Sequence, residues 1–312
     1  DYPAFEVIAA NDRSSDGTGE IMDRIAAEDS RLRVIHIAEL PEGWLGKNHA
    51  LHRGAARAEG EILLFTDADV MLRHDALSRA VGLLERQGLD HLAVAPRMHV
   101  GGPWARMTLA TFLLVFSAWF KPWRARDPKS RRHIGVGAFN LVRAEAYRAI
   151  GGHQGIALRP DDDIRLGRRL KEAGHRQAAA VGRYTVLVEW YPSLRAMAHG
   201  LRKNAFATVG YRILPILAGS LAAALFTFWP VVALFVTEGM ALRLNAAIVL
   251  LGVLSHWDLA AVYGQPRWVA FAYPLGGLFL FGIIWMAALA NLRSDGIDWR
   301  GTRYGLEELR RG

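Results

Sequence analysis

The sequence predicts an α/β fold with a mostly parallel sheet and helices on both faces, followed by C-terminal transmembrane helices. Three observations support this prediction. Short apolar strands alternate with helical segments in the first part of the chain, acidic turns follow two of these strands, and the chain becomes mostly apolar from residue 213. Strand–helix alternation is typical of parallel sheets, which bind ligands outside the carboxyl ends of their strands.

The expected elements follow one another in a regular order. Strands are expected at residues 6–10, 32–37, 61–65 and 92–96, and helices at residues 19–28, 47–58 and 75–86. Turn-forming residues separate the first strand from its helix, and Asp67 and Asp69 directly follow the third strand. The acidic turns therefore lie at the edge of the sheet where ligands bind.

Composition excludes several classes of protein. The chain has 312 residues, a formal net charge of +8, 52% hydrophobic residues and no cysteine. This apolar content excludes a disordered chain, and the absence of cysteine excludes a disulfide framework, a thiolate zinc site and a cysteine nucleophile. The chain begins at Asp1 without a signal peptide, so we treat the N-terminus as a truncation.

Two apolar stretches are long enough to cross a bilayer. Residues 213–237 and 268–292 each contain 25 uncharged residues, and about 20 suffice. Between them, residues 244–255 are uncharged but end at His256 and Asp258, which fits a third span or a re-entrant or interfacial helix. The basic region before residue 213 and the Arg-rich tail 293–312 favour two spans, because both then face the cytoplasm; three spans stay open.

Basic segments border the apolar ones. Residues 107–120 are uncharged but short for a span, and predict an interfacial helix followed by a basic segment at 121–132. Residues 193–212 predict an amphipathic interfacial helix with Leu194, Met197, Leu201 and Ala205 on its apolar face. These basic residues favour contact with anionic membrane lipids. Nucleic acid is not an expected partner, because stacking aromatics do not alternate with the basic residues.

The acidic turns are the candidate site. Asp67 and Asp69 are one residue apart in an extended turn, and two such carboxylates can hold a hard divalent cation, Mg²⁺ or Mn²⁺. The alternative is a solvated turn whose carboxylates accept backbone N–H groups. Asp12 lies in the turn after the first strand, where ordinary loop chemistry is again the alternative. The Gly46–Lys47 region does not have the spacing of a P-loop.

Five segments in order resemble the family 2 inverting glycosyltransferases of GT-A fold, over residues 1–210. They include Asn11-Asp12-Arg13-Ser14-Ser15-Asp16-Gly17-Thr18, Gly46-Lys47-Asn48-His49-Ala50-Leu51 and Thr66-Asp67-Ala68-Asp69. They also include Gly137–Arg143 with Ile150-Gly151-Gly152-His153, and Asp161-Asp162-Asp163-Ile164-Arg165-Leu166. The subgroup that the chain most resembles is the membrane-bound enzymes that glycosylate lipids: hopanoid-associated, carotenoid and ceramide glucosyltransferase-like proteins.

The resemblance implies a role for each acidic residue and for one lysine. Asp12 would contact the uracil or ribose of a UDP-sugar, Lys47 would lie near the nucleotide, and Asp67 would contact the ribose. Asp69, with Asp67, would hold Mn²⁺ or Mg²⁺ on the diphosphate. Asp163 would be the catalytic base, and Asp162 beside it is assigned to the substrate. The family's first strand would precede Asp1. The Gln-x-x-Arg-Trp motif of the family's polymerases is missing at 199–204, which favours transfer of a single sugar.

These expectations define a domain plan and a function. A GT-A catalytic domain would occupy residues 1–192, an interfacial helix 193–212, the transmembrane region 213–292 and a basic cytoplasmic tail 293–312. We expect a multi-pass protein of the bacterial inner membrane that transfers one sugar, with inversion, from a nucleotide-sugar donor to a lipid hydroxyl at the cytoplasmic face. The alternatives are a polyisoprenyl-phosphate glycosyltransferase, or an inactive membrane protein that binds partners. The oligomeric state is not predicted.

Overall fold

The computed structural model describes residues 1–202, 205–294, 296–299 and 302–305. The chain divides into two compact units. The first contains residues 1–96 and 122–186, and the second contains residues 97–121 and the chain from Leu187 onward. Residues 97–121 thus group with the C-terminal segments, although they fall inside the range predicted as one catalytic domain. Much of the basic tail predicted at 293–312 lies outside the described residues.

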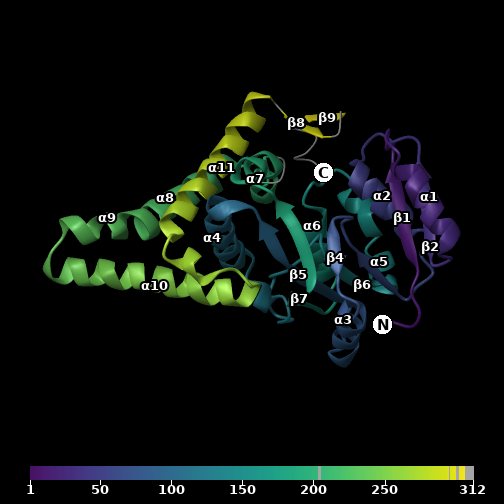
Figure 1. The fold of residues 1–312 in the computed structure, drawn as a ribbon, viewed down its shortest axis with the longest axis horizontal. Helices are drawn as coiled ribbons and strands as arrows, with labels where there is room; N and C mark the ends of the chain where they lie inside the picture. Colours follow the sequence, from purple (N-terminus) through teal and green to yellow (C-terminus); the bar gives the residue numbers. More distant parts are fainter. Residues whose placement is uncertain (203–204, 295, 300–301, 306–312) are drawn as a thin grey trace. The chain divides into compact units, whose positions relative to one another are not determined.

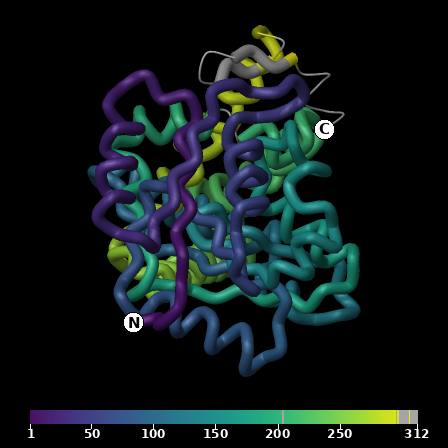
Figure 2. The backbone as a smooth tube through the Cα atoms, turned by 90° about the vertical axis from the view of Figure 1, so that its right-hand side faces the viewer, coloured from purple at the N-terminus to yellow at the C-terminus, as the bar shows by residue number. Residues whose placement is uncertain are grey.

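The first unit begins with a small parallel sheet. Strand β1 (Val7–Asp12) pairs in parallel with β2 (Leu32–Ile37), and α1 (Thr18–Glu28) connects them. Helix α2 (Gly46–Ala55) packs on β1, as Figure 1 shows at the purple end of the chain. Figure 2 follows the same backbone from another side. The predicted strand–helix–strand order is therefore confirmed here, with each boundary within two residues of its predicted position.

A second, mixed sheet has the strand order β3-β6-β5-β7-β4. Its strands are β3 (Ile62–Phe65), β4 (Val70–Leu72), β5 (His91–Val100), β6 (Asn140–Arg143) and β7 (Gln177–Tyr191). Strand β6 runs antiparallel to both β3 and β5, so β3 and β5 point in the same direction. The alternation pattern did not predict β4, β6 or β7. These described strands thus form a two-stranded parallel sheet and a five-stranded mixed sheet, where the sequence predicted a mostly parallel one.

Helices cover both faces of this sheet, as predicted. Leu63 and Phe65 point to one face, where α5 (Ala144–Ala149) and α6 (Asp162–Glu172) complete a buried cluster. Ile62 and Leu64 point to the other face, towards α3 (Ala76–Arg86). Successive side chains of a strand alternate between faces, and this explains why β3 is apolar throughout. The carboxyl end of β3 then leads directly into Asp67.

The second unit is helical. Helix α4 (Gly102–Phe120) packs against α10 (Gly239–Tyr263) and α11 (Tyr273–Arg293), with eight of its residues buried. A Cβ at Gly276 would collide with the Met107 carbonyl, so α4 and α11 approach closely at this glycine. Instead of lying alone at an interface, the predicted helix over 107–120 is longer and covered by two neighbours. Short strands β8 (Gly296–Trp299) and β9 (Thr302–Gly305) follow α11.

Among the described residues, three helices are long and apolar enough to cross a membrane, judged by length and composition. They are Ile213–Val236, Gly239–Tyr263 and Tyr273–Arg293. The first consists of α8 (Ile213–Ala223), a π-helical turn (Ala224–Phe228) and α9 (Trp229–Val236). The sequence favoured two spans because both basic ends would then face the cytoplasm, and it left open whether the middle stretch, with His256 and Asp258 at its end, is a third span. The helix continues past both, because His256 is buried against Thr111 of α4 and its Nδ1 lies 2.8 Å from the Gly252 carbonyl.

The amphipathic helix predicted at 193–212 is shorter than expected. Helix α7 covers Leu194–Leu201 and begins at Ser193, whose hydroxyl accepts a hydrogen bond from the Ala196 N–H. Met197 and Leu201 are buried, which confirms part of its apolar face. Gly200, a weak helix former, precedes the end of the helix. A short 3₁₀ turn (Ala207–Val209) follows, so residue 205 does not extend the helical face.

Candidate active site

An ion-pair network joins three distant parts of the first unit. The Nζ atom of Lys47, in the first turn of α2, lies 3.0 Å from Asp67 Oδ1 and 3.3 Å from Asp162 Oδ1. Asp67 follows β3, and Asp162 is the first residue of α6. Lys47 is about a third exposed, whereas Asp162 is almost fully buried. Three of the predicted site residues therefore lie together, which their positions in the sequence alone did not show.

Asp163 lies in the same recess, held by backbone groups. Its Oδ2 accepts a hydrogen bond of 2.7 Å from the Gly137 N–H, and its Oδ1 one of 2.8 Å from the Ile164 N–H. The backbone around Gly135 packs directly on α6, because a Cβ at Gly135 would collide with the Asp163 carbonyl. A Cβ at Gly167 would likewise collide with the Ile134 carbonyl. The glycines thus allow the 134–137 segment to reach the carboxylate.

The charges in this recess shift one another's pKa values. Burial raises the pKa of Asp162 to about 7, against the opposing effect of the Lys47 ammonium. Burial also raises the pKa of Asp163, although Lys47 and the two N–H groups stabilise its anion. Burial opposes the charge on Lys47, but the surrounding carboxylates outweigh it and raise the Lys47 pKa. Lys47 therefore stays protonated, and it neutralises part of the acidic cluster.

Asp12 lies on the other side of the α2 N-terminus. Its carboxylate accepts hydrogen bonds of 2.9 and 3.2 Å from the guanidinium of Arg13, a residue with a positive φ of 55°. A Cβ at Gly46 would collide with the Asp12 carboxylate, so β1 and α2 approach closely here. Asp12 and Lys47 therefore flank the same helix end, although Asp12 makes no ion pair with the Lys47 network.

Asp69 is placed differently from the other site residues. It is exposed and makes no hydrogen bond or ion pair with any described residue. Within the described part of the chain, no group of three or more His, Asp or Glu side chains could hold a metal ion. Asp67 and Asp69 therefore form no closed cage. A divalent cation at these two carboxylates would need further ligands, since Mg²⁺ often takes one or two carboxylates plus phosphate oxygens.

The recess around Lys47 is narrow. Its volume is about 10 Å³, which is room for about one water molecule. The lining residues are Lys47, Leu51, Phe65, Thr66, Asp67, Gly137, Asn140, His153, Asp162 and Asp163. The Thr66 hydroxyl donates a 2.8 Å hydrogen bond to the Ala138 carbonyl and so ties the acidic turn to the Gly137 segment. The acidic turn and the start of α6 are thus held against each other by both ion pairs and hydrogen bonds.

Asn48 positions the network, a role that sequence reasoning missed. Its Nδ2 lies within 2.8–3.1 Å of the carbonyl oxygens of Ile156, Ala157 and Arg159. Asn48 is buried and follows Lys47, so it fixes α2 to the segment that leads into α6. The Gly46-Lys47-Asn48 motif singled out this residue, but its partners lie more than 100 positions away. Asn48 therefore sets the distance between Lys47 and Asp162.

Two neutral polar side chains, Tyr147 and His153, pack together beside the recess. The Tyr147 hydroxyl lies 2.7 Å from His153 Nδ1, and the His153 ring packs edge-on against Phe65. Burial lowers the pKa of His153 to about 3 and raises that of Tyr147 to about 12, so both stay neutral near pH 7. A neutral His153 adds no second positive charge beside Lys47. The pair was also not predicted from the sequence.

Comparison with known proteins gives a family match for the first part of the chain. The mixed α/β fold is GT-A-like, and residues 1–151 match the family described as Glycosyl transferase family 2. This segment is therefore similar to the family that the motifs indicated, over a little less than half of the chain. The match includes Asp12, Lys47, Asp67 and Asp69 and ends before α6.

Curated relatives include enzymes named for lipid substrates. The beta-monoglucosyldiacylglycerol synthase of Trichormus variabilis is 29% identical over 170 residues, or 53% of this chain and 35% of the synthase. The 4,4'-diaponeurosporenoate glycosyltransferase of Staphylococcus haemolyticus is 26% identical over 167 residues, 52% of this chain and 43% of that enzyme. The matches thus span less than half of these relatives' own lengths. Residues 1–349 of S. aureus TarS align with 98% of this chain and 88% of that structure, at 12% identity and a TM-score of 0.43.

Proposed function

We propose that this protein transfers a single sugar from a nucleotide-sugar donor to the hydroxyl group of a lipid, with inversion at the anomeric carbon. The observation that carries the proposal is the cluster of Lys47, Asp67, Asp162 and Asp163, of which Lys47 and Asp67 lie in the segment that matches Glycosyl transferase family 2. The described part of the chain contains three membrane-length apolar helices, and two relatives are named for a glucosyldiacylglycerol and for diaponeurosporenoate. A lipid acceptor agrees with both observations.

The donor would bind at the N-terminus of α2. Asp12 on one side and Asp67 on the other would contact the nucleoside of a UDP-sugar, while Lys47 provides a fixed positive charge near the diphosphate. The free N–H groups at the start of α2 also favour an anion. Asp69 and Asp67 would hold Mn²⁺ or Mg²⁺, which would supply Lewis-acid stabilisation of the diphosphate leaving group.

Asp163 would act as the general base. As the acceptor oxygen bonds to the anomeric carbon, the hydroxyl proton moves to the Asp163 carboxylate and the bond between that carbon and the diphosphate oxygen breaks. A single displacement of this kind inverts the configuration. The Gly137 and Ile164 N–H groups orient the carboxylate, and its buried setting raises its pKa, as a base that receives a proton requires. Asp162 would help to bind the substrate beside Lys47.

The proposed function also implies a location for the protein in the membrane. We propose a multi-pass protein of the bacterial inner membrane with its catalytic domain on the cytoplasmic side, where nucleotide sugars are made and anionic lipids attract the basic segment at 121–132. Three membrane-length helices place the two ends of the helical region on opposite sides if all three cross. If only two cross, both basic ends face the cytoplasm.

The direct test compares lipid extracts by mass. Cells that express the chain within its full-length gene should contain a lipid heavier by one sugar residue than cells without the gene. Cells expressing the Asp163→Asn variant at equal level serve as the matched control and should contain less than about a hundredth of that species. If the extracts are identical with and without the active gene, the proposal of lipid glycosylation is wrong.

A further inference from the structure

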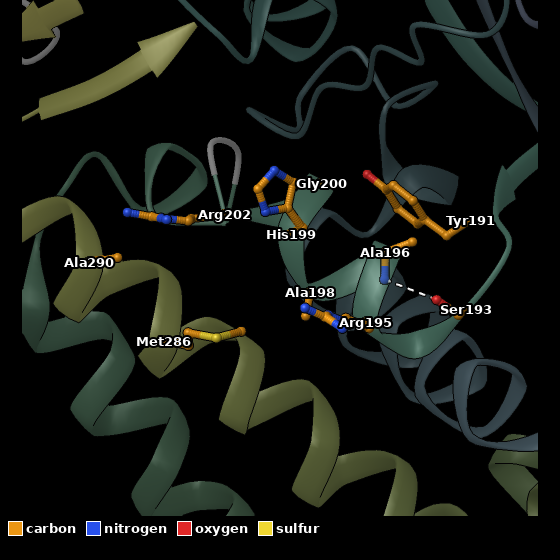
Figure 3. A pocket seen from close by; sticks show the side chains of 10 residues that line it. All are labelled: Tyr191, Ser193, Arg195, Ala196, Ala198, His199, Gly200, Arg202, Met286 and Ala290. Atoms are coloured by element: carbon orange, nitrogen blue, oxygen red, sulfur yellow. Dashed lines mark hydrogen bonds between the residues drawn. The ribbon is translucent and has the colours of Figure 1, made fainter.

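A second pocket lies in the helical unit. Its lining residues come from other parts of the sequence than those of the acidic cluster and differ from them in composition. It has a volume of about 770 Å³, within the range of small-molecule and lipid sites. Figure 3 shows that it lies between α7 and α11, beside the end of β7. Its lining residues are Tyr191, Ser193, Arg195, Ala196, Ala198, His199, Gly200, Arg202, Met286 and Ala290.

The α7 side of this pocket is cationic. Arg195, His199 and Arg202 are spaced by four and three residues, so they lie along one face of the helix. All three are exposed, and none of them forms an ion pair with a described residue. The described lining residues include no Asp or Glu. Two guanidinium groups on one face, neither of them paired with a described carboxylate, are a favourable site for a phosphate group, which arginine binds through paired N–H donors.

The opposite wall is apolar and belongs to a membrane-length helix. Met286, which is 47% exposed, and Ala290 lie seven and three residues before Arg293, where α11 ends. At 1.5 Å per residue, they lie about 10 and 5 Å from that charged end. In a bilayer this level corresponds to the boundary between headgroups and acyl chains. The pocket therefore combines a cationic wall with an apolar wall at the depth where an amphiphile changes from polar to apolar.

The pocket is built by close packing. A Cβ at Gly200 would collide with the ring of Tyr191, so the glycine lets this ring rest directly on α7. The Ser193 hydroxyl caps the same helix by accepting the Ala196 N–H at 3.1 Å. Asn291 of α11 donates to the Arg202 carbonyl at 3.3 Å and links the two walls. These contacts fix α7 against α11.

We propose that this pocket binds one anionic phospholipid, with its phosphate at Arg195, His199 and Arg202 and an acyl chain along Met286 and Ala290. A free inorganic phosphate has the same head chemistry but would leave the apolar wall and most of the volume unfilled. The site goes beyond the proposed sugar transfer, because it needs neither donor nor acceptor and contains none of the residues placed in the acidic cluster.

The test uses the full chain in detergent micelles without nucleotide sugar. Native mass spectrometry counts the bound lipid after addition of phosphatidylglycerol, phosphatidylcholine or phosphatidylglycerol with excess inorganic phosphate. We expect one retained phosphatidylglycerol, at least tenfold weaker retention of phosphatidylcholine, and little competition by inorganic phosphate. Displacement of the lipid by inorganic phosphate at comparable concentration would instead identify a free-phosphate site and overturn the lipid proposal.

Three variants distinguish lipid binding in this pocket from general attraction between the basic protein and anionic lipid. The Arg195→Gln/Arg202→Gln double variant should weaken phosphatidylglycerol retention by about tenfold or more. Arg243→Gln removes an exposed charge near the start of α10 and should change retention by less than twofold. Ala290→Trp keeps every charge but fills the apolar wall, and should also weaken retention by about tenfold. Equal retention by Ala290→Trp and the unchanged protein, with both equally folded by circular dichroism, would overturn the proposal.

Discussion

The Lys47 Nζ atom lies 3.0 Å from Asp67 Oδ1, which connects the first turn of α2 to the carboxyl end of β3. The contact places a permanent cation beside the acidic turn that the sequence assigned to the donor. Lys47 thus already pairs with the Asp67 carboxylate of this turn, and an incoming diphosphate would contact Lys47 at the same place. This relationship makes Lys47 the first residue to test.

Replacement of Lys47 by Met should weaken donor binding. The change keeps the length of the side chain but removes the ammonium, so three neighbouring aspartates lose their countercharge. Loss of a charged hydrogen bond typically costs about 1.5–3 kcal/mol, so UDP-sugar affinity should fall by roughly 10–150-fold, measured by calorimetry. Lys129→Met, at an exposed lysine outside the network, is the control. Unchanged affinity in Lys47→Met would remove Lys47 from the donor site.

Asp163→Asn should slow transfer while it preserves donor binding. A general base typically contributes about 10²–10⁴-fold to the rate, and the amide cannot accept the acceptor's proton. Asp161→Asn is the matched control, since the Asp161 carboxylate pairs with Arg159 and Arg165 at 3.0 Å and makes no contact with the Lys47 network. Both rates and both UDP-sugar affinities should be measured in the full-length protein.

The outcome also separates two acceptor chemistries. A phosphate acceptor is already anionic and needs no base, as in the polyisoprenyl-phosphate alternative. If Asp163→Asn transfers sugar at the unchanged rate, the acceptor is such an anion, and the hydroxyl mechanism is wrong. If Asp161→Asn were as slow as Asp163→Asn, the defect would lie in the packing of the α6 N-terminus rather than in proton transfer.

Asp69→Ala should abolish the metal dependence of donor binding. Asp69 is exposed and has no protein partner among the described residues, so its loss should leave the melting temperature almost unchanged. UDP-sugar binding should be titrated with and without Mn²⁺. We expect the metal-dependent gain in affinity to disappear in Asp69→Ala and to persist in Glu85→Ala, an exposed acidic residue on α3. A persistent Mn²⁺ effect in Asp69→Ala would exclude this carboxylate as a metal ligand.

Acid should destabilise the first unit through its buried histidines. Burial lowers the pKa of His91 to about 4 and that of His153 to about 3, whereas an unfolded histidine titrates near 6.5. Below pH 6.5 the unfolded chain therefore binds more protons than the folded one. Each histidine then removes about 1.4 kcal/mol of stability per pH unit, until its own folded pKa is reached.

The raised pKa of Asp162 has the opposite effect on stability as the pH falls. The contribution of His91 is therefore measured as the difference in pH dependence of stability between the unchanged protein and a His91 variant. The His91 ring shares a 2.6 Å hydrogen bond with Asn140, and His91→Gln keeps a donor there without the titrating group. The fall in melting temperature between pH 7 and pH 5 should be smaller in His91→Gln than in the unchanged protein. Equal slopes would show that His91 does not stay neutral in the folded state.

Local patterns in the sequence were sufficient for the class of fold and the position of the motifs. The continuous apolar run of β3, the turn residues after β1 and the long uncharged stretches after residue 212 depend on neighbours in the chain. Each therefore predicted its element to within a few residues. The family motifs likewise identified Asp12, Lys47, Asp67 and Asp69 before any contact was known.

Only the tertiary structure determined which of these residues meet. Lys47 and Asp162 are 115 positions apart, and Asn48, Gly135 and Gly137 set their spacing through contacts that no local pattern encodes. The sequence left the middle apolar stretch open between a span and an interfacial helix for the same reason, since the partner of His256 is Thr111 of a distant helix. The periodicity of apolar residues in the sequence indicates which side chains face inward. The path of the folded chain determines which residues those side chains contact.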